Sequence, residues 1–487
     1  MRSTYFAALV AGVLATTGSA VVAGSTSAVA APRAAVAHDD FNGDGYPDLV
    51  TAAPKAAVGG RTGAGFVSVL YGSSSGINTA RKAVLTQSSA GVPGTPEAGD
   101  AFGASVASAD LDGDGYADLA IGVPGEDIDS ATDAGGITVV WGSAGGLTGT
   151  SSWLQSDTVG TPSANEAFGT GLTAADVDAD GHQELAHVNG TDSVYVHDFA
   201  DSRTPANPEQ LYGIPTEDGF KPTGLTGADY DKNGYADLVV TGTQPSLEQV
   251  ESRSVLLRSD QDGLVLDRTF AGGSVGTSGD INKDGYPDLV LGAPRVLEHG
   301  EWDLSGGSVQ VRYGSNLGLF GSNGEEPVTV FQQGQNGVPG VDELGDDFGS
   351  DVSLGDVNGD GYLDLAIGSQ GEGIGDLADA GAVWLLRGSA RGVTSAGVQN
   401  FNQDTAGVPG AAEEGDFFGA QARLIDSDRD GHAELVTTAP DENYDEGFAW
   451  VLDGTPSGLT TSGSWSFGAA ALGAPQDNAH FGSTVAK

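Results

Sequence analysis

Short runs in which apolar and polar residues alternate recur along the whole chain, and Gly, Pro or Asp residues separate them. One clear set comprises residues 104–108, 118–124, 136–141 and 153–155. Alternation with period two between turn-forming residues predicts β-strands. No stretch shows the period of an amphipathic helix. The pattern therefore predicts repeated units of four short antiparallel strands.

A nine-residue acidic segment lies between the first two predicted strands of each unit and occurs seven times. The copies begin at residues 40, 110, 176, 229, 280, 356 and 426, and read DFNGDGYPD, DLDGDGYAD, DVDADGHQE, DYDKNGYAD, DINKDGYPD, DVNGDGYLD and DSDRDGHAE. A supersecondary unit that recurs every 50 to 75 residues or so is typical of a repeat array or propeller. Seven units of four strands predict an all-β fold, a seven-bladed β-propeller with a calcium loop in each blade.

The spacing within each segment is that of a calcium loop. Ca²⁺ takes six to eight hard oxygen ligands, and a Gly at the sixth position permits the sharp turn that gathers them. Positions 1, 3, 5 and 9 supply side-chain oxygens, and position 7, a Tyr or His, supplies its backbone carbonyl. The sequence predicts up to seven Ca²⁺ ions, held by Asp40, Asn42, Asp44, Tyr46 and Asp48; Asp110, Asp112, Asp114, Tyr116 and Asp118; Asp176, Asp178, Asp180, His182 and Glu184; Asp229, Asp231, Asn233, Tyr235 and Asp237; Asp280, Asn282, Asp284, Tyr286 and Asp288; Asp356, Asn358, Asp360, Tyr362 and Asp364; and Asp426, Asp428, Asp430, His432 and Glu434.

All predicted ligands of one ion come from one local loop, which favours a structural ion over a catalytic or ligand-bridging ion. The loops at Asp110, Asp176 and Asp426 contain four carboxylates each, so we expect them to bind Ca²⁺ more tightly than loops with three.

The composition restricts the possible functions. The formal net charge is −47, which excludes nucleic-acid binding through a basic surface. The chain contains no Cys, so it has neither a disulfide nor a thiol nucleophile.

The N-terminus has the features of a signal peptide. Arg2 precedes a weakly apolar, Ala- and Val-rich run, and Ala28-Val29-Ala30 forms a cleavage site of the A-x-A type. Thr, Ser and Gly interrupt the run, which disfavours the alternative of a membrane anchor. We predict a signal peptide over residues 1–30, a secreted, extracellular product from residue 31 to 487, and no membrane span in the mature chain.

Two further motifs flank the acidic segments. Phe-Gly pairs occur at residues 102–103, 168–169, 348–349, 418–419 and 481–482, and residues 52–54, 122–124, 292–294 and 438–440 end in Pro after two small or β-branched residues. With a calcium loop between the two motifs, the chain resembles the FG-GAP repeat family, which includes the N-terminal propeller of integrin alpha subunits and bacterial relatives. The third and fourth units depart from the pattern, because residues 187–190 and 241–243 replace the second motif. No Phe-Gly precedes the loops at Asp229 or Asp280, and we expect short variable loops there.

Closure of the ring has two solutions in the sequence. Residues 481–486 repeat the first strand of a blade, and residues 33–39 align with the same position in the first blade. The sequence leaves open which terminus supplies the first strand of the first blade.

Two segments resemble catalytic motifs, but neither is interpreted as a catalytic site. Residues 72–76 match G-x-S-x-G, but residues 142–146 and 388–392 occupy the same position with Ala in place of the central Ser, which indicates a hairpin turn. His182 and His187 have the wrong spacing for a zinc-binding H-E-x-x-H motif. The sequence therefore predicts no catalytic residues.

The loops opposite the calcium turns are the candidates for recognition, since binding residues concentrate on loops that a rigid scaffold holds. They include residues 126–129, 295–305 with Trp302, and 441–444, and the Gly-Val-Pro-Gly links at 91–94, 337–340 and 407–410 share their face. We predict a non-enzymatic binding or cell-adhesion module whose partner is an unknown extracellular protein or glycan. A secreted hydrolase of the phospholipase or esterase type, or a carbohydrate-binding propeller, is the alternative.

Overall fold

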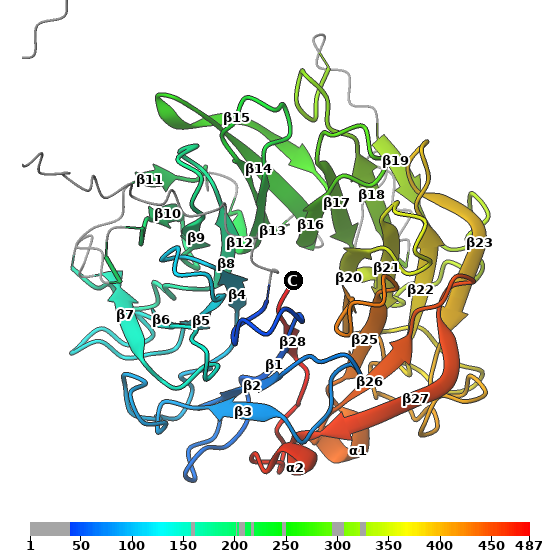
Figure 1. Cartoon of the computed structure of the whole chain (residues 1–487), viewed down its shortest axis with the longest axis horizontal. Helices are drawn as coiled ribbons and strands as arrows, with labels where there is room; N and C mark the ends of the chain where they lie inside the picture. Colours follow the sequence, from blue (N-terminus) through cyan, green and yellow to red (C-terminus); the bar gives the residue numbers. More distant parts are fainter. Residues whose placement is uncertain are drawn as a thin grey trace, which may run out of the picture. The chain divides into compact units, whose positions relative to one another are not determined.

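A computed structural model describes residues 39–156, 161–200, 202–203, 210–215, 219–245, 250–294, 306–321 and 328–487. The predicted signal peptide and Trp302 lie outside the described residues. Within them, seven four-stranded antiparallel sheets follow one another around a ring (Figure 1). The all-β, seven-bladed propeller predicted from the strand pattern is confirmed.

Each blade consists of four consecutive strands, except the first, which takes its first strand from the C-terminal end of the chain. Blade 1 contains β28 (Thr484–Val485), β1 (Leu49–Ala53), β2 (Phe66–Leu70) and β3 (Lys82–Leu85). Blade 2 contains β4 (Val106–Ala109), β5 (Asp118–Val123), β6 (Gly136–Val140) and β7 (Ser151–Gln155). Blade 3 contains β8 (Gly171–Ala175), β9 (Glu184–Val188), β10 (Ser193–His197) and β11 (Gln210–Gly213).

The remaining blades follow the same plan. Blade 4 contains β12 (Lys221–Ala228), β13 (Asp237–Pro245), β14 (Val250–Asp260) and β15 (Gly263–Ala271). Blade 5 contains β16 (Val275–Gly279), β17 (Asp288–Ala293), β18 (Ser308–Arg312) and β19 (Val328–Phe331). Blade 6 contains β20 (Phe348–Gly355), β21 (Asp364–Ser369), β22 (Ala382–Arg387) and β23 (Thr394–Phe401). Blade 7 contains β24 (Gln421–Ile425), β25 (Glu434–Ala439), β26 (Phe448–Asp453) and β27 (Thr460–Gly468). Two single-turn helices, α1 (Glu442–Asp445) and α2 (Ala469–Leu472), interrupt the all-β pattern in blade 7.

The C-terminal segment closes the ring. In strand β28, Thr484 pairs with Ala52 and Val485 pairs with Thr51 of β1. Lys487 forms an ion pair with the buried Asp351. Of the competing N-terminal segment, only Asp39 is among the described residues, and its carboxylate accepts a hydrogen bond from Arg423 at 2.7 Å. The C-terminal residues thus take the position that the sequence left open.

The hydrophobic core is divided among the blade junctions. Seven clusters of buried apolar side chains each draw on two neighbouring blades. The Phe side chains of the five Phe-Gly pairs are fully buried in these clusters. Burial of a Phe side chain contributes about 2 kcal/mol, so these residues stabilise the contact between blades rather than single sheets.

Each Phe-Gly pair also fits closely against the backbone of the preceding blade. The Phe102 amide donates to the Ala64 carbonyl at 3.1 Å, just before the third strand of blade 1. The same bond links Phe168 to Ala134, Phe348 to Gly306, Phe418 to Ala380 and Phe481 to Glu446. In blade 1, Gly65 follows Ala64, and a Cβ on Gly65 would lie 2.3 Å from the Phe102 carbonyl oxygen. Only Gly is compatible with this approach.

The Gly of a Phe-Gly pair packs against the Pro-ending motif of the preceding blade. Gly103 has a φ of 91°, and a Cβ there would lie 2.9 Å from the Ala52 Cβ and 2.8 Å from Val67 Cγ2. At the next junction, a Cβ on Gly122 would lie 2.2 Å from the Gly169 carbonyl oxygen. The two family motifs are therefore the two sides of one contact between blades.

The junctions between blades 3 and 4 and between blades 4 and 5 lack this contact, as the sequence predicts. Only residues 189–192 separate β9 from β10, and only residues 246–249 separate β13 from β14, so the variable loops are short there. The cores at these two junctions contain Phe220, and Phe270 with Phe320, in place of a Phe-Gly pair.

We expect Gly103→Ala to lower the free energy of unfolding by about 3 kcal/mol, because the new Cβ combines positive-φ strain with overpacking. Gly99→Ala is the matched control. Gly99 lies in the same junction with a φ of 98°, and a Cβ added there would have no other atom within 4 Å, so only the strain of about 1 kcal/mol remains. Urea unfolding measures both, and equal losses would show that the blade contact tolerates a methyl group.

Candidate metal centres

The seven acidic segments occupy equivalent turns. Six of them connect the first and second strands of blades 2 to 7, and the segment at Asp40 precedes β1. In an up-and-down sheet these turns share a face with the turns between the third and fourth strands. The opposite face has the second-to-third-strand loops and the links between blades. We call the two faces the calcium-loop face and the variable face.

Each segment is folded inward by hydrogen bonds between its side chains and its own backbone. In the first, Asp40 Oδ2 accepts from the Gly45 amide at 2.8 Å, Asn42 Oδ1 from Asp44 at 2.9 Å, and Asp44 Oδ1 from Tyr46 at 3.2 Å. The other six segments repeat this pattern from positions 1, 3 and 5. In every loop the side chains at positions 1, 3 and 5 therefore fold back over the backbone of their own turn.

The carboxylate at position 9 has a second role that the sequence did not reveal. Asp48 is buried, and its two oxygens accept from the Phe41 amide at 3.0 Å and from the Gly72 amide at 2.8 Å. Gly72 begins the turn between the third and fourth strands. Asp118, Asp288 and Asp364 make the same pair of bonds in their blades. In these four blades position 9 thus joins the two turns of the calcium-loop face, whereas Glu184 and Glu434 accept bonds from Val177 and Ser427 of their own segments.

Burial shapes the electrostatics of position 9. It raises the pKa of Asp48 and of Glu184 to about 8 and that of Asp118 to about 7, although backbone hydrogen bonds act in the opposite direction. The charges of the neighbouring carboxylates raise these pKa values further. A cation in the loop would offset this repulsion.

The donor sets fit a hard cation. Three loops bring carboxylate oxygens within 4.8 Å of one another: Asp110, Asp112 and Asp118; Asp176, Asp178, Asp180 and Glu184; and Asp426, Asp428 and Glu434. Among the described residues, the buried oxygens Asp176 Oδ1, Glu184 Oε1 and Asp280 Oδ1 have no hydrogen-bond partner. An unpartnered buried carboxylate oxygen is costly, and coordination of Ca²⁺ would satisfy it.

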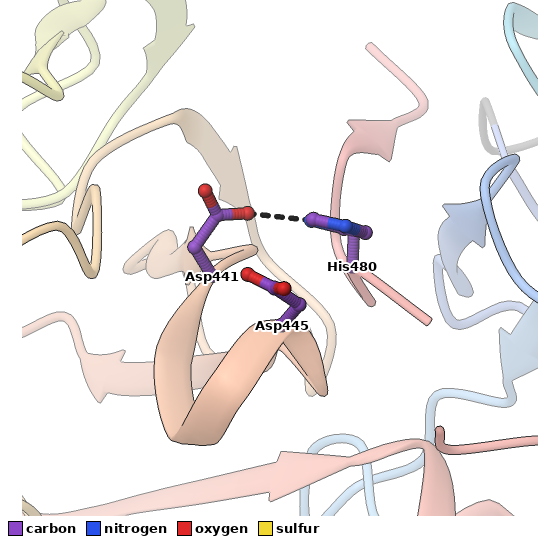
Figure 2. A group of neighbouring side chains, drawn as sticks. All are labelled: Asp441, Asp445 and His480. Carbon is purple, nitrogen blue, oxygen red and sulfur yellow. Dashed lines mark hydrogen bonds and ion pairs between the residues drawn. The ribbon is translucent and has the colours of Figure 1, made fainter. Parts of the chain in front are cut away.

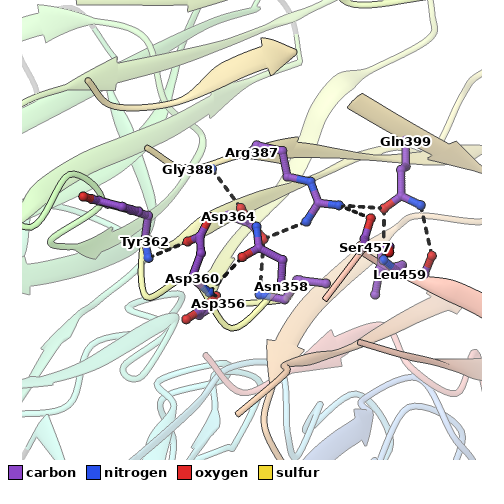
Figure 3. Close-up of polar contacts among 12 residues, drawn as sticks. Asp356, Asn358, Asp360, Tyr362, Asp364, Arg387, Gly388, Gln399, Ser457 and Leu459 are labelled. Carbon is purple, nitrogen blue, oxygen red and sulfur yellow. Dashed lines mark hydrogen bonds and ion pairs between the residues drawn. The ribbon is translucent and has the colours of Figure 1, made fainter. Parts of the chain in front are cut away.

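Arginine side chains contact four of the seven loops, which the sequence patterns did not predict. Arg81 lies 2.8 Å from Asp44, Arg203 3.0 Å from Asp114, and Arg258 3.1 Å from Asp231. In the fourth, Arg387 Nη1 lies 3.2 Å from Asp364 Oδ2, while its Nη2 donates to the Ser457 carbonyl of blade 7 at 2.6 Å (Figure 3). These guanidinium groups would compete with a cation for the same carboxylates. That loops with four carboxylates bind Ca²⁺ more tightly than loops with three therefore stays a prediction, and an arginine beside a loop should weaken its binding.

The variable face contains a cluster that the sequence did not indicate. His480 Nδ1 lies 2.5 Å from Asp441 Oδ1, and Asp445 turns toward the same imidazole (Figure 2). His480 immediately precedes the last Phe-Gly pair, and its amide donates to the Asp445 carbonyl at 2.8 Å. The cluster fastens the closing segment to blade 7. Beside it, Tyr444 is 95% exposed.

The motifs that mimic catalytic sites have structural roles. Ser73 Oγ donates to the Gly76 carbonyl at 2.8 Å, and Ser143 and Ser389 make the same bond in their blades, so the G-x-S-x-G match is a hairpin turn. His187 is buried in β9, away from the exposed His182, and its Nε2 lies 3.2 Å from Nε2 of the buried His197. The two imidazole rings are nearly parallel, and the His187 ring packs on Tyr195 and Phe168.

The repeated units match a known protein family. A family model described as FG-GAP repeat matches residues 33–70, 102–140, 271–309 and 348–386, which lie in blades 1, 2, 5 and 6. The chain carries FG-GAP repeats. Among the described residues, no helix has the length and apolar character needed to cross a membrane.

Curated relatives contain similar segments within much longer chains. Phosphatidylinositol-glycan-specific phospholipase D of Mus musculus is 33% identical over 170 residues, which are 34% of this chain and 18% of that protein. Integrin alpha-5 of Xenopus laevis is 32% identical over 162 residues, which are 33% of this chain and 14% of that protein. Integrin alpha-3 of Mus musculus is 27% identical over 187 residues, which are 37% and 16% of the two chains. The matched regions span less than a fifth of each relative.

The buried histidine pair generates a prediction for pH dependence. Burial lowers the pKa of His197 to about 4 and that of His187 well below its usual value. A folded-state pKa below the unfolded value of about 6.5 stabilises the fold above that pH and less so as the pH falls toward 4. His197→Gln removes one titrating group. Between about pH 7 and pH 5, the free energy of unfolding of the variant should therefore fall by about 2 kcal/mol less than that of the wild type.

Urea unfolding of both proteins at the two pH values measures this difference. His182→Gln, at an exposed position of the same blade, is the control and should follow the wild type. Parallel losses in all three proteins would mean that the buried pair is not the group that takes up the proton.

Proposed function

We propose that this protein is a secreted, calcium-loaded propeller of the integrin-alpha type that acts as a non-enzymatic binding or adhesion module. The observation that carries the proposal is the recurrence of one acidic turn at seven equivalent positions on one face, each with the side-chain oxygens of positions 1, 3 and 5 bonded to its own backbone. In this proposal residues 1–30 are a signal peptide, and the mature chain meets extracellular Ca²⁺, which can fill even loops that bind at about 10⁻⁴–10⁻³ M.

The ions are structural in this proposal. Positions 1, 3, 5 and 9 would hold each ion together with the carbonyl at position 7, and the ion would supply the positive charge that the gathered carboxylates lack. Where the residue at position 9 also holds the turn between the third and fourth strands, as Asp48, Asp118, Asp288 and Asp364 do, binding of Ca²⁺ would stabilise both turns of the blade at once.

Recognition belongs to the variable face. Tyr444, which is 95% exposed, is of a residue type that is enriched among the central contacts of protein interfaces. Its backbone is unusual as well, because Asn443, Tyr444 and Asp445 all have positive φ between 56° and 66°. The strongly acidic chain favours a partner with a cationic surface.

A hydrolase is the second candidate, and the similarity to phosphatidylinositol-glycan-specific phospholipase D is the observation that favours it. Incubation of the purified protein with ester and phosphodiester substrates, with and without Ca²⁺, tests it directly. Turnover that survives further purification would replace the binding module by an enzyme.

Removal of Ca²⁺ should lower the melting temperature, since ligand that binds only the folded state adds about 2.7 kcal/mol per site at a hundredfold excess over Kd. Thermal unfolding with a chelator and after return of Ca²⁺ measures the effect. The double variant Asp178→Asn and Asp180→Asn should lower the bound Ca²⁺, measured by atomic emission, by one ion per chain.

The control for that variant is Asp192→Asn, an exposed carboxylate on the variable face of the same blade. It should leave the ion count unchanged. An unaltered melting temperature in the chelator would contradict a structural role for the ions.

Tyr444→Ala should weaken capture of the partner at least about tenfold if Tyr444 is a central contact. Immobilised wild-type protein first captures proteins from the extracellular milieu, and a glycan array tests for a sugar ligand. The control is Leu317→Ser, because Leu317 is 55% exposed on the calcium-loop face. If Tyr444→Ala binds the partner as the wild type does and Leu317→Ser loses binding, recognition lies on the calcium-loop face, which contradicts the proposal.

A further inference from the structure

Three blade junctions contain the same set of one Gln, one Asp and one Glu on the variable face. The Gln and the Asp are buried in all three sets, whereas the Glu is buried in the third and partly buried in the first two. We call these sets the carboxyl clasps. They consist of Gln87, Asp100 and Glu126; Gln333, Asp346 and Glu372; and Gln403, Asp416 and Glu442. In each clasp the Gln follows the last strand of one blade, the Asp lies in the link, and the Glu begins the variable loop of the next blade.

The geometry of the three clasps is nearly identical. The Gln Nε2 donates to the Glu Oε2 at 2.6 Å, 2.6 Å and 2.5 Å in turn. The Asp Oδ2 accepts from the amides of Glu97, Glu343 and Glu413 at 2.6 Å, 2.8 Å and 2.8 Å. The three Gln residues are only 4%, 1% and 1% exposed. Each clasp therefore ties a variable loop to the link that borders it.

Two carboxyl groups act on each other in each clasp. The charge of Asp100 raises the pKa of Glu126, that of Glu372 raises the pKa of Asp346, and that of Asp416 raises the pKa of Glu442. Among the described residues, the Oε1 atoms of all three Gln side chains have no hydrogen-bond donor. A protonated carboxyl would add a donor to a set that is rich in acceptors.

The surroundings also favour the protonated form. Burial raises the pKa of Glu126, Asp346 and Glu442 to about 7 and that of Asp100 to about 6. The other charged groups that act on the clasps are all carboxylates, namely Glu97, Asp127, Asp342, Glu343 and Glu413. Each of them raises the pKa further.

We propose that the carboxyl clasps are proton-operated fasteners: with a proton bound, each clasp holds its variable loop closed on the blade link, and loss of the proton releases the loop. The two carboxylates then repel each other, and opening of the loop gives both of them fuller access to water. The device acts on the face opposite the calcium loops and does not depend on the proposed function.

Hydrogen exchange of residues 125–135, 371–381 and 441–447, read by mass spectrometry with Ca²⁺ in excess, tests the proposal. A carboxyl with a pKa near 7 in the closed loop and near 4.5 in the open loop shifts the balance about tenfold toward the open loop between about pH 6 and pH 8.5. After correction for the intrinsic exchange rate, wild-type protection in these loops should fall by that factor.

The triple variant Glu126→Gln, Asp346→Asn and Glu442→Gln neutralises in each clasp the carboxyl whose pKa is raised to about 7, and it should keep its protection at both pH values. The control variant Asp129→Asn with Glu414→Gln changes exposed carboxyls on the same face and should behave as the wild type does. Circular dichroism verifies that each variant folds. Wild-type protection that is equal at both pH values, or a pH dependence that persists in the triple variant, would overturn the proposal.

Discussion

The close approach of backbone at the blade junctions is the contact on which the ring depends. A buried Phe fills the space between two sheets, while the Gly that follows it lies against a small residue of the neighbouring blade, as Gly103 does against Ala52. The first interaction supplies apolar burial, and the second sets how near the sheets can come. Neither would be sufficient alone, because burial is not directional and close approach requires an apolar core to hold it.

This contact also explains why the two faces of the ring differ. The Phe-Gly pair enters each junction beside the variable loop, so the loops of that face can change in length without disturbing the fold. On the calcium-loop face, the turns are bound to each other through buried carboxylates such as Asp48, which leaves little freedom. Blades 3 and 4 show the converse, since the loss of the pair from the following junctions accompanies short variable loops.

Local patterns predicted most of this architecture because the features that determine it are local. Period-two strands, the acidic turns and the Phe-Gly pairs each occupy a few consecutive residues, and their repetition gives the number of blades. Features that join distant segments were missed. Arg387 reaches Ser457, 70 residues away, and His480 meets Asp441 only because the C-terminal segment closes the ring.

One missed contact was within reach of sequence reasoning. His187 pairs with Tyr195 across the β9–β10 hairpin, and His197 lies two residues further along the same face. The register of so short a hairpin brings such diagonal neighbours together. The carboxyl clasps are intermediate, because the Gln, the Gly-Val-Pro-Gly link and the acidic run recur three times in the sequence. Their repetition indicated a shared role, but only the folded chain shows that the amide of each Gln donates to the Glu of the next blade. Both faces of the ring thus gather carboxylates, and on the variable face an amide from the preceding blade holds one of each pair in place.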